Sequence, residues 1–288
     1  VRKEHANNAE DGDRVLVEIT EWGQSGEKVA WGKVVRRYND VDDHNWTMES
    51  ILIENGFSSD YPKDVLNEVQ KIPVDISPED IDGRRDFREI LTFTIDPDTA
   101  QDFDDAISYQ ELDNGNTEIG VHIADVTHYL KPNTALDQEA YNRSTSVYLV
   151  DRCIAMLPEK LSNNLCSLMP KVDRLTFSAV FTFNKKQKLV GEWFGKGIIF
   201  SDKRFTYMEA QASLEDKKGL YHKELSRVNK VAYALRKEKF DNGAIAFESD
   251  ELSFKLDEKN KPIGVFIKER KDAHLLVEDF MLLANRRV

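Results

Sequence analysis

Apolar and polar residues alternate over positions 13–38 of the chain. Val15, Val17 and Ile19 fall on one face of a predicted strand, and a second alternating run ends near Val35 after a turn that contains two glycines. A period of two is typical of half-buried strands, so this region predicts a β-hairpin from a small barrel. Because two strands alone are only marginally stable, we expect the hairpin to pack against further structure.

The next segment, residues 39–81, is predicted to be connecting structure. One short helical pattern ends at Gly56 and another follows Pro62. Ser77 and Pro78 predict the start of a third helix, because Ser is a favoured N-cap and Pro fits the first turn.

From residue 91 onward the pattern predicts strands and helices together. Leu91, Phe93 and Ile95 alternate as a strand that leads directly into an acidic stretch. The Asn-Gly step within residues 113–116 is a strong hairpin signal. Further predicted strands lie at 106–112, 119–126, 177–183, after the turn at 184–188, and at 252–256 and 263–267, and predicted helices lie at about 222–240 and from 277 to 288. These elements predict an α+β or mixed α/β fold of antiparallel hairpins with helices.

The composition is that of a globular protein, with 40% hydrophobic and 32% charged residues. No apolar run approaches the roughly 20 residues needed to span a membrane, so we expect no membrane partner. The chain starts at Val1 without a signal-peptide pattern, and we expect an internal fragment of a longer protein. Cys153 and Cys166 lack the neighbours of a zinc site. They suit a reducing cytoplasm, and the sequence is also compatible with a single disulfide between them.

The net charge of −12 argues against a polyanionic partner, but the charge is unevenly distributed. Residues 81–140 contain 14 acidic residues and four Lys or Arg, whereas residues 141–210 contain 11 Lys or Arg and six acidic residues. This order suits a metal site beside a phosphate-binding surface, although basic residues on solvated turns explain it equally well.

Five aspartates follow the predicted strand at 91–95. They are Asp96, Asp98, Asp102, Asp104 and Asp105. At about 4 Å, two like charges near a protein surface cost a few kcal/mol, so the cluster has to be solvated, protonated or neutralised by a metal ion. An EF-hand is excluded because Gln101 and Ile107 stand where that motif requires Gly and Glu.

Two chemical interpretations remain beside that of a solvated, turn-forming loop. Residues 96–99 match the DxDxT of aspartyl-phosphate phosphatases, in which the first Asp is the nucleophile and the second the acid/base. That match is short and leaves the later aspartates unexplained. In the second interpretation the aspartates converge on Mg²⁺, which takes a few protein carboxylates together with substrate phosphates and supports phosphoryl transfer.

Several longer motifs accompany the acidic stretch. They are Thr92-Phe93-Thr94-Ile95-Asp96-Pro97, Asp102-Phe103-Asp104-Asp105-Ala106, and the segments at 120–129, 146–149, 156–168 and 278–285. In this order they closely resemble the ribonuclease II and ribonuclease R family of exoribonucleases, and the ribonuclease R branch most of all. The resemblance implies that residues 1–45 are the C-terminal part of a cold-shock domain of the OB-fold type, 46–83 a connector, and 84–288 the N-terminal part of the RNB catalytic domain.

The resemblance implies a magnesium-dependent enzyme, with Mn²⁺ able to substitute, that degrades single-stranded RNA from its 3′ end to nucleoside 5′-monophosphates. The matching motif positions imply four catalytic-centre aspartates, Asp96, Asp102, Asp104 and Asp105. Asp96, Asp102 and Asp105 are the implied metal ligands, and Asp104 is implied to serve the chemical step or a second metal. Asp98 falls at a variable position of the family and is expected to be solvated.

The resemblance also implies residues that contact RNA. Tyr148 matches the aromatic residue on which the family stacks the terminal base, although the residue by itself reads as a buried strand residue. Arg143 and Arg152, and also Arg174, are candidate phosphate contacts in the basic stretch, and each equally suits a role as a surface charge or a carboxylate partner. The family marker at 161–168 is expected to pack rather than react.

His122, Asp125 and His128 suggest a metal trio by their spacing. A strand would place His122 and Asp125 on opposite faces, so structural roles are expected for all three.

The resemblance is incomplete at its C-terminal end. Family members carry, beyond the position that corresponds to Val288, an Arg and a Glu that assist cleavage and an S1-type domain that adds RNA affinity. We therefore expect this fragment alone to be inactive or nearly so. The alternative from another functional class is an RNA-binding module that kept the fold without catalysis.

Overall fold

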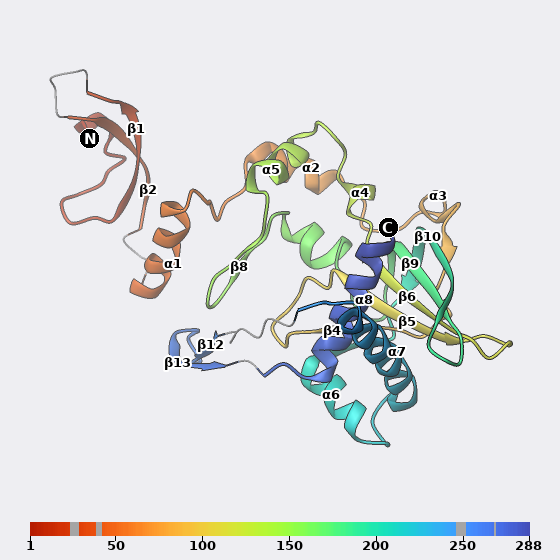
Figure 1. The fold of residues 1–288 in the computed structure, drawn as a ribbon. Coiled ribbons are helices and arrows are strands. Elements are labelled where there is room, and N and C mark those ends of the chain that lie inside the picture. Colours follow the sequence, from red (N-terminus) through yellow and green to blue (C-terminus); the bar gives the residue numbers. More distant parts are fainter. Residues whose placement is uncertain (24–28, 39–41, 246–251, 268) are drawn as a thin grey trace. The chain divides into compact units, whose positions relative to one another are not determined.

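The structure is a computed structural model that describes residues 1–23, 29–38, 42–245, 252–267 and 269–288. The chain forms two compact units, Val1–Asp60 and Tyr61–Val288 (Figure 1).

The first unit contains the predicted hairpin. Its elements are the 3₁₀ turn η1 (Lys3–His5), the strands β1 (Val15–Glu21) and β2 (Trp31–Arg37), and the helix α1 (Asp43–Glu54). β1 and β2 pair antiparallel with two register shifts, as expected of a strongly twisted two-stranded ribbon. The buried ring of Tyr38, directly after β2, meets Trp46 of α1 edge-on at 5.0 Å between centroids. The hairpin therefore packs against α1, which provides the further structure that two strands alone need.

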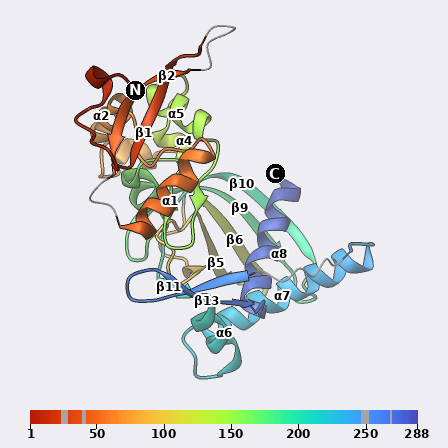
Figure 2. The same ribbon diagram turned by 90° about the vertical axis from the view of Figure 1, so that its left-hand side faces the viewer.

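A seven-stranded mixed sheet forms the centre of the second unit (Figure 2). Its strands are β3 (Arg85–Asp86), β4 (Thr92–Asp96), β5 (Asp105–Glu111), β6 (Thr117–Ala124), β9 (Asp173–Phe183), β10 (Leu189–Phe200) and β11 (Lys203–Thr206). They lie in the order β11-β4-β5-β6-β9-β10-β3. The four pairs from β4 to β10 are antiparallel, whereas β11 runs parallel to β4 and β3 runs parallel to β10.

Helices and two small hairpins complete this unit. The helices are α2 (Lys63–Lys71), α3 (Pro78–Ile81), α4 (Val126–Tyr129), α5 (Ala135–Arg143), the π-helical turn η2 (Leu161–Leu165), α6 (Tyr207–Glu215), α7 (His222–Asp241) and α8 (Asp272–Arg287). The hairpins pair β7 (Val147–Tyr148) with β8 (Cys153–Ile154) and β12 (Leu252–Leu256) with β13 (Pro262–Ile267). Among the described helices, none combines the length and the apolar character that a membrane crossing requires.

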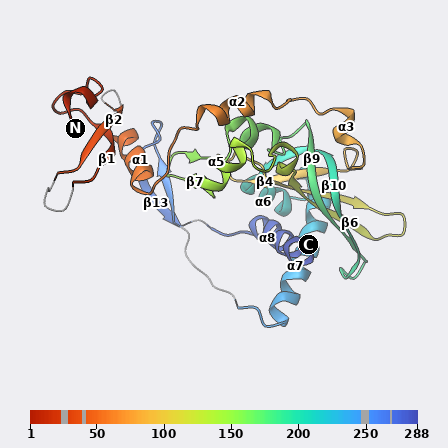
Figure 3. The ribbon, with the colours of Figure 1, turned by 90° about the horizontal axis from the view of Figure 1, so that it is seen from above.

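The sheet has an apolar core on each face. On one face, α6, α7 and α8 cover alternate strand residues such as Ile107 and Val121. Phe93 and Phe205 meet edge-on there at 5.9 Å, which joins β4 to β11. The opposite face packs against α2, α5 and η2 through residues such as Ala106 and Val180. Figure 3 shows α2 and α5 on one side of the sheet and α7 and α8 on the other.

Lys160 connects two of the covering helices. Its ammonium group donates hydrogen bonds to the carbonyl oxygens of Val69, Gln70 and Ile72 at 3.0, 3.1 and 2.6 Å. These carbonyls lie at the C-terminal end of α2, where a helix leaves acceptors without partners and favours positive charge.

His122, Asp125 and His128 have structural partners, as the sequence analysis expects. His122 is fully buried in β6 between the hydroxyl groups of Ser108 and Ser178, each 2.8 Å away. Burial and the charge of Arg85 lower the pKa of His122 to about 3, so its ring is neutral at physiological pH.

Asp125 forms a buried ion pair with Arg84 at 2.7 Å, and both side chains are less than 5% exposed. His128 lies at the edge of this pair, 3.2 Å from Asp80 of α3. The pair thereby joins the segment before β3 to the end of β6.

The sequence pattern predicts most of these elements correctly, including β4, β5, β6, β9, α7 and α8. It misses several elements, among them the short helix α4, the π-helical turn η2, the longer helices α5 and α6, and the short strands β3, β8 and β11. The two longer missed helices carry start signals: Thr134 accepts a hydrogen bond from the backbone of Asp137, and Thr206 and Glu209 form a capping box.

The ion pair of Asp125 generates a stability prediction. We expect Asp125→Asn to lower the free energy of unfolding by about 3 to 5 kcal/mol, because it leaves the buried Arg84 without its counter-charge. Urea denaturation measures the loss. Asp241→Asn is the control, since Asp241 pairs with Lys237 on the surface with both side chains more than 60% exposed, and it should cost about 1 kcal/mol at most. Equal losses in the two variants would contradict the prediction.

Candidate metal and RNA site

The four motif aspartates lie where two neighbouring strands meet the acidic loop. Asp96 is the last residue of β4 and Asp105 the first of β5. These strands are antiparallel partners, with Phe93 opposite Ile107, so the end of one and the start of the other lie at the same edge of the sheet. The loop at 97–104 joins them and carries the other two aspartates.

A single hydroxyl group holds this loop on both sides of Asp102. The Ser167 hydroxyl accepts a hydrogen bond from the backbone of Phe103 at 3.0 Å and donates one to the carbonyl oxygen of Gln101 at 2.8 Å. The backbone of Leu168 donates to the carbonyl oxygen of Phe103 at 2.8 Å. Ser167 and Leu168 belong to the predicted packing segment at 161–168, which contacts the acidic loop through these hydrogen bonds.

Arg174 supports the same segment from β9. Its guanidinium group donates to the carbonyl oxygens of Asn164 and Ser167 at 3.0 and 2.9 Å and to the Asn164 side chain at 2.8 Å. The residue is only 8% exposed. Arg174 thus has a structural role here, because its guanidinium group is buried and hydrogen-bonded to the chain rather than exposed to a phosphate.

The carboxyl groups resist carrying charge together. Burial, and then the charges of Asp96 and Asp104, raise the pKa of Asp105 to about 7. Burial raises the pKa of Asp96 to about 6, even though the Thr94 hydroxyl group and, to a smaller extent, the cation of Arg204 act in the opposite direction. Desolvation and the charge of Asp102 also raise the pKa of Asp104, although part of this residue reaches solvent. The folded site therefore favours protonated carboxyl groups, or ionised carboxylates beside a bound cation.

The donor set fits a Mg²⁺ site that substrate completes. The buried Oδ2 atom of Asp96 has no hydrogen-bond partner among the described residues, and such an acceptor is costly unless a cation or donor approaches it. Within the described ranges, no three His, Cys, Asp or Glu side chains are grouped to hold an ion by themselves. Mg²⁺ commonly binds one or two carboxylates together with waters and phosphate oxygens. Asp96 and Asp105 therefore suit a site that water and phosphate complete better than a site in which protein side chains supply every ligand.

Tyr148 lies beside the acidic loop and faces solvent. Its hydroxyl group donates a hydrogen bond to Oδ2 of Asp102 at 3.0 Å, while the residue remains 69% exposed. Partial burial and the hydrogen bond to Asp102 raise the pKa of Tyr148, so the phenol stays protonated. The expectation from the residue alone, a buried strand residue, is wrong: Tyr148 is in a short strand, but its ring is available for stacking.

Arg143 and Arg152 already have partners. Arg143 pairs with Glu139 at 2.8 Å and stacks 4.0 Å from the ring centroid of Tyr61, with its side chain 8% exposed. Arg152 pairs with Asp151 at 2.5 Å. RNA contact by either residue stays a prediction.

Two further residues complete the account of the acidic loop. Asp98 is exposed, as expected for a solvated position. The phosphatase interpretation needs Asp98 as acid/base in a doubly wound fold, and the mainly antiparallel sheet does not support it. Arg204 of β11 is a residue that the sequence analysis missed, and its guanidinium group contacts the loop directly. Its only sequence signal is membership of the basic stretch 141–210.

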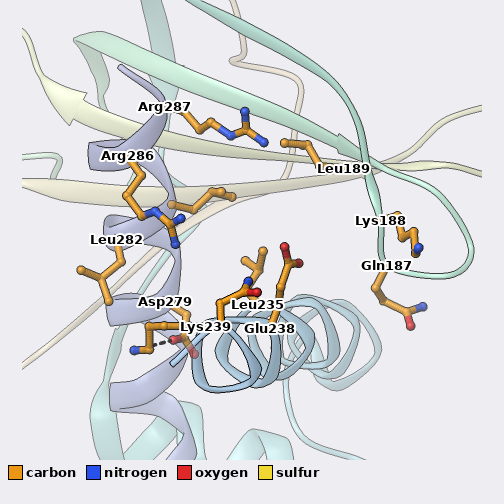
Figure 4. Close-up of a pocket in the computed structure, with 12 residues that line it drawn as sticks. Gln187, Lys188, Leu189, Leu235, Glu238, Lys239, Asp279, Leu282, Arg286 and Arg287 are labelled. Atoms are coloured by element: carbon orange, nitrogen blue, oxygen red, sulfur yellow. Dashed lines mark ion pairs between the residues drawn. The ribbon is translucent and has the colours of Figure 1, made fainter. Parts of the chain in front are cut away.

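A cavity of about 650 Å³ lies between the β9–β10 turn, α7 and α8 (Figure 4). Lys188, Lys239, Arg286 and Arg287 contribute positive charge to its lining, and Lys239 pairs there with Asp279 at 3.9 Å. None of the motif aspartates lines it. The acidic site is therefore a feature of the strand ends and their loop, separate from this cavity.

Comparisons with known proteins agree with this architecture. The family model described as RNB domain matches residues 84–288, and the model described as cold shock domain matches residues 1–62. DIS3-like exonuclease 2 of Schizosaccharomyces pombe is 42% identical over 94% of the chain, and ribonuclease R of Thermotoga maritima is 37% identical over the whole chain. The chain spans 31% and 42% of the lengths of these two relatives.

Solved structures share the fold. Mycoplasma genitalium RNase R in complex with ribose-methylated single-stranded RNA superposes on 99% of the chain with a TM-score of 0.87 and 25% identity, and the match covers 45% of that structure. The yeast pseudonuclease Ssd1 matches 92% of the chain and 33% of its own length, with a TM-score of 0.66 at 20% identity, which shows the fold alone. Because the RNB model covers most of the sequence, including both strand-end aspartates and the loop between them, the chain belongs to the RNB-domain family of the ribonuclease R and DIS3-like exonucleases.

Proposed function

We propose that the protein containing this chain is a Mg²⁺-dependent exoribonuclease, with Mn²⁺ able to substitute, that degrades single-stranded RNA from its 3′ end to nucleoside 5′-monophosphates. The observation that carries the proposal is the pairing of β4 and β5, which places Asp96 and Asp105 at one sheet edge with raised pKa values and an unpartnered buried oxygen. Free thiols at Cys153 and Cys166 are compatible with the further proposal of a reducing cytoplasm.

Each aspartate has a distinct part in this proposal. Asp96 and Asp105 hold the metal, because they are the most strongly desolvated members of the cluster and benefit most from a positive charge. When bound, Mg²⁺ neutralises these carboxylates and stabilises charge on the reacting phosphate. Asp104 reaches solvent and serves the chemical step. Asp102 supports the site and orients Tyr148, and a metal contact by Asp102 remains part of the proposal.

Tyr148 provides a platform for the terminal base. Its exposed ring presents a π-face, and stacking of a base on an aromatic ring contributes roughly 1 to 3 kcal/mol without dependence on sequence. The hydrogen bond to Asp102 connects this platform to the acidic loop. Recognition of the 3′ terminus and cleavage would thus occur at adjacent positions.

Replacement of Asp104 tests the catalytic proposal. We expect Asp104→Asn, in the protein that contains this chain, to lower the rate of RNA hydrolysis about 100-fold or more, because the amide can neither take up a proton nor bind a cation as a carboxylate does. RNA affinity should change little. A 5′-labelled oligonucleotide in Mg²⁺ measures the rate, and a filter-binding assay measures the affinity.

Asp98→Asn is the matched control, because it makes the same chemical change at an exposed position of the same loop. It should keep the normal rate. If the unaltered protein binds RNA without shortening it, the protein is an RNA-binding module and the proposal is wrong.

The raised pKa values predict the pH dependence of stability without metal. An Asp of the unfolded chain titrates near pH 4, whereas Asp96 and Asp105 titrate near 6 and 7 in the folded state. The folded state therefore binds protons more tightly, and this stabilisation, complete at low pH, is lost as the pH rises to about 7. In EDTA we expect the free energy of unfolding to fall by about 2 to 4 kcal/mol between pH 5 and pH 8.

Urea denaturation at several pH values measures this slope. Asp105→Asn should flatten it and Asp98→Asn should leave it unchanged. Mg²⁺ should restore stability at pH 8, because the ion replaces the lost protons. A slope of opposite sign in the unaltered chain would contradict the assignment of both raised pKa values.

Two substitutions of Tyr148 separate its ring from its hydroxyl group. We expect Tyr148→Ala to weaken binding of single-stranded RNA by roughly 1 to 3 kcal/mol, whereas Tyr148→Phe keeps the ring and most of the affinity. Fluorescence anisotropy with a labelled oligonucleotide measures both. Equal loss in the two variants would show that stacking is not the main contribution of Tyr148.

A further inference from the structure

Arg204 contacts the acidic loop from a strand that lies about 100 residues further along the sequence. β11 runs parallel to β4, with Arg204 opposite Thr94 and Thr206 opposite Asp96. This pairing brings the Arg204 side chain to the end of β4, where the chain leaves the sheet for the loop at 97–104.

The guanidinium group contacts both parts of the loop. One of its terminal nitrogens, Nη2, donates to the carbonyl oxygens of Pro97 and Asp98 at 2.5 and 2.9 Å, directly after Asp96. The centre of the guanidinium group also lies 5.5 Å from the ring centroid of Phe103, directly before Asp104. One side chain thus spans the turn between the two ends of the acidic cluster.

The loop has few other attachments at this end. Near Pro97, the backbone makes a turn bond from Ala100 to the carbonyl oxygen of Pro97 at 3.1 Å, and Pro97 itself has no N–H to donate. Ser167 holds the other end, around Phe103. Arg204 and Ser167 therefore hold opposite ends of the loop, and mutual repulsion among the aspartates acts against both.

We propose that Arg204 is a positioning residue, which holds the loop after Asp96 in the shape that brings the motif aspartates together for a divalent cation. The inference rests on the proposed metal site and adds a residue to it. Arg204 acts through the carbonyl oxygens of Pro97 and Asp98 and through Phe103, without contact with the reacting atoms.

The sign of the effect on metal affinity separates this role from simple electrostatics. A nearby positive charge repels a divalent cation, so Arg204→Met would tighten metal binding if only the charge mattered. If Arg204 positions the loop, the same substitution weakens binding, because groups that orient metal ligands typically contribute 10- to 100-fold to affinity. The two explanations thus predict opposite results.

The experiment uses the 288-residue chain with Mn²⁺ as the probe, titrated by electron paramagnetic resonance at about pH 8. We expect Arg204→Met to weaken Mn²⁺ binding about tenfold and to broaden the spectrum of the bound ion. Arg204→Lys keeps the charge and one donor direction, so it should recover most of the affinity. Lys203→Met is the matched control, because Lys203 lies next to Arg204 in β11 and pairs with Glu209 at 3.3 Å.

Hydrogen exchange gives a second measurement that needs no metal. In EDTA, the amides of residues 98–104 should exchange faster in Arg204→Met, and those of the sheet strands should not. Unchanged exchange in the loop, or unchanged or tighter Mn²⁺ binding, would overturn the proposal. If Arg204→Met unfolds, loop exchange in the Arg204→Lys variant decides: a smaller acceleration in the same loop supports the proposal, and none overturns it.

The same measurements distinguish this inference from the proposed function. If the unaltered chain shows no saturable Mn²⁺ binding, the metal site of the proposed function fails. Loop exchange then decides the role of Arg204 alone: faster exchange in Arg204→Met but not in Lys203→Met supports it, and equal exchange overturns it.

Discussion

Repulsion among the aspartates is the constraint on which the rest of this structure depends. Asp96 and Asp105 lie at the ends of two paired strands, and the loop between them carries Asp102 and Asp104. Burial raises the pKa of both strand-end carboxyl groups, so the folded chain holds them at an energetic cost when no cation is bound. A site of this kind needs a rigid surrounding structure that does not relax to separate the charges.

Both faces of the sheet contribute that rigidity. On one face, α6, α7 and α8 cover the strands that end at the site. On the other face, η2 and the segment after it bring Ser167 against the loop, and Arg174 holds that segment through three hydrogen bonds. The loop is therefore attached to the core by backbone and side-chain hydrogen bonds rather than by contacts among the aspartates themselves. Among the described residues, this arrangement leaves the buried Oδ2 atom of Asp96 without a hydrogen-bond partner.

In the proposed function, the uneven distribution of charge is what reconciles a net charge of −12 with an RNA substrate. The negative charge at the ends of β4 and β5 is the part that the proposed metal ion would neutralise. Tyr148 would add a contact of another kind, because stacking does not depend on charge. Its exposed ring beside Asp102 would receive a base while the proposed metal ion receives a phosphate. The arginines that the sequence suggests for RNA contact have carboxylate or backbone carbonyl partners within the chain, and their contact with RNA stays a prediction.

The sequence by itself determined the local features of this protein. The alternating strands, the long helix at 222–241, the turn at 113–116 and the order of the motif aspartates are all encoded in consecutive residues, and the motifs identify the family. Only the tertiary structure decided which distant residues serve the acidic loop. Arg204 reaches it through the parallel pairing of β11 with β4, and Ser167 reaches it through the core on the other face of the sheet. Such contacts join segments 60 to 110 residues apart. The periodicity of a segment shows only which face of its own helix or strand a residue occupies, so it cannot predict contacts with distant segments.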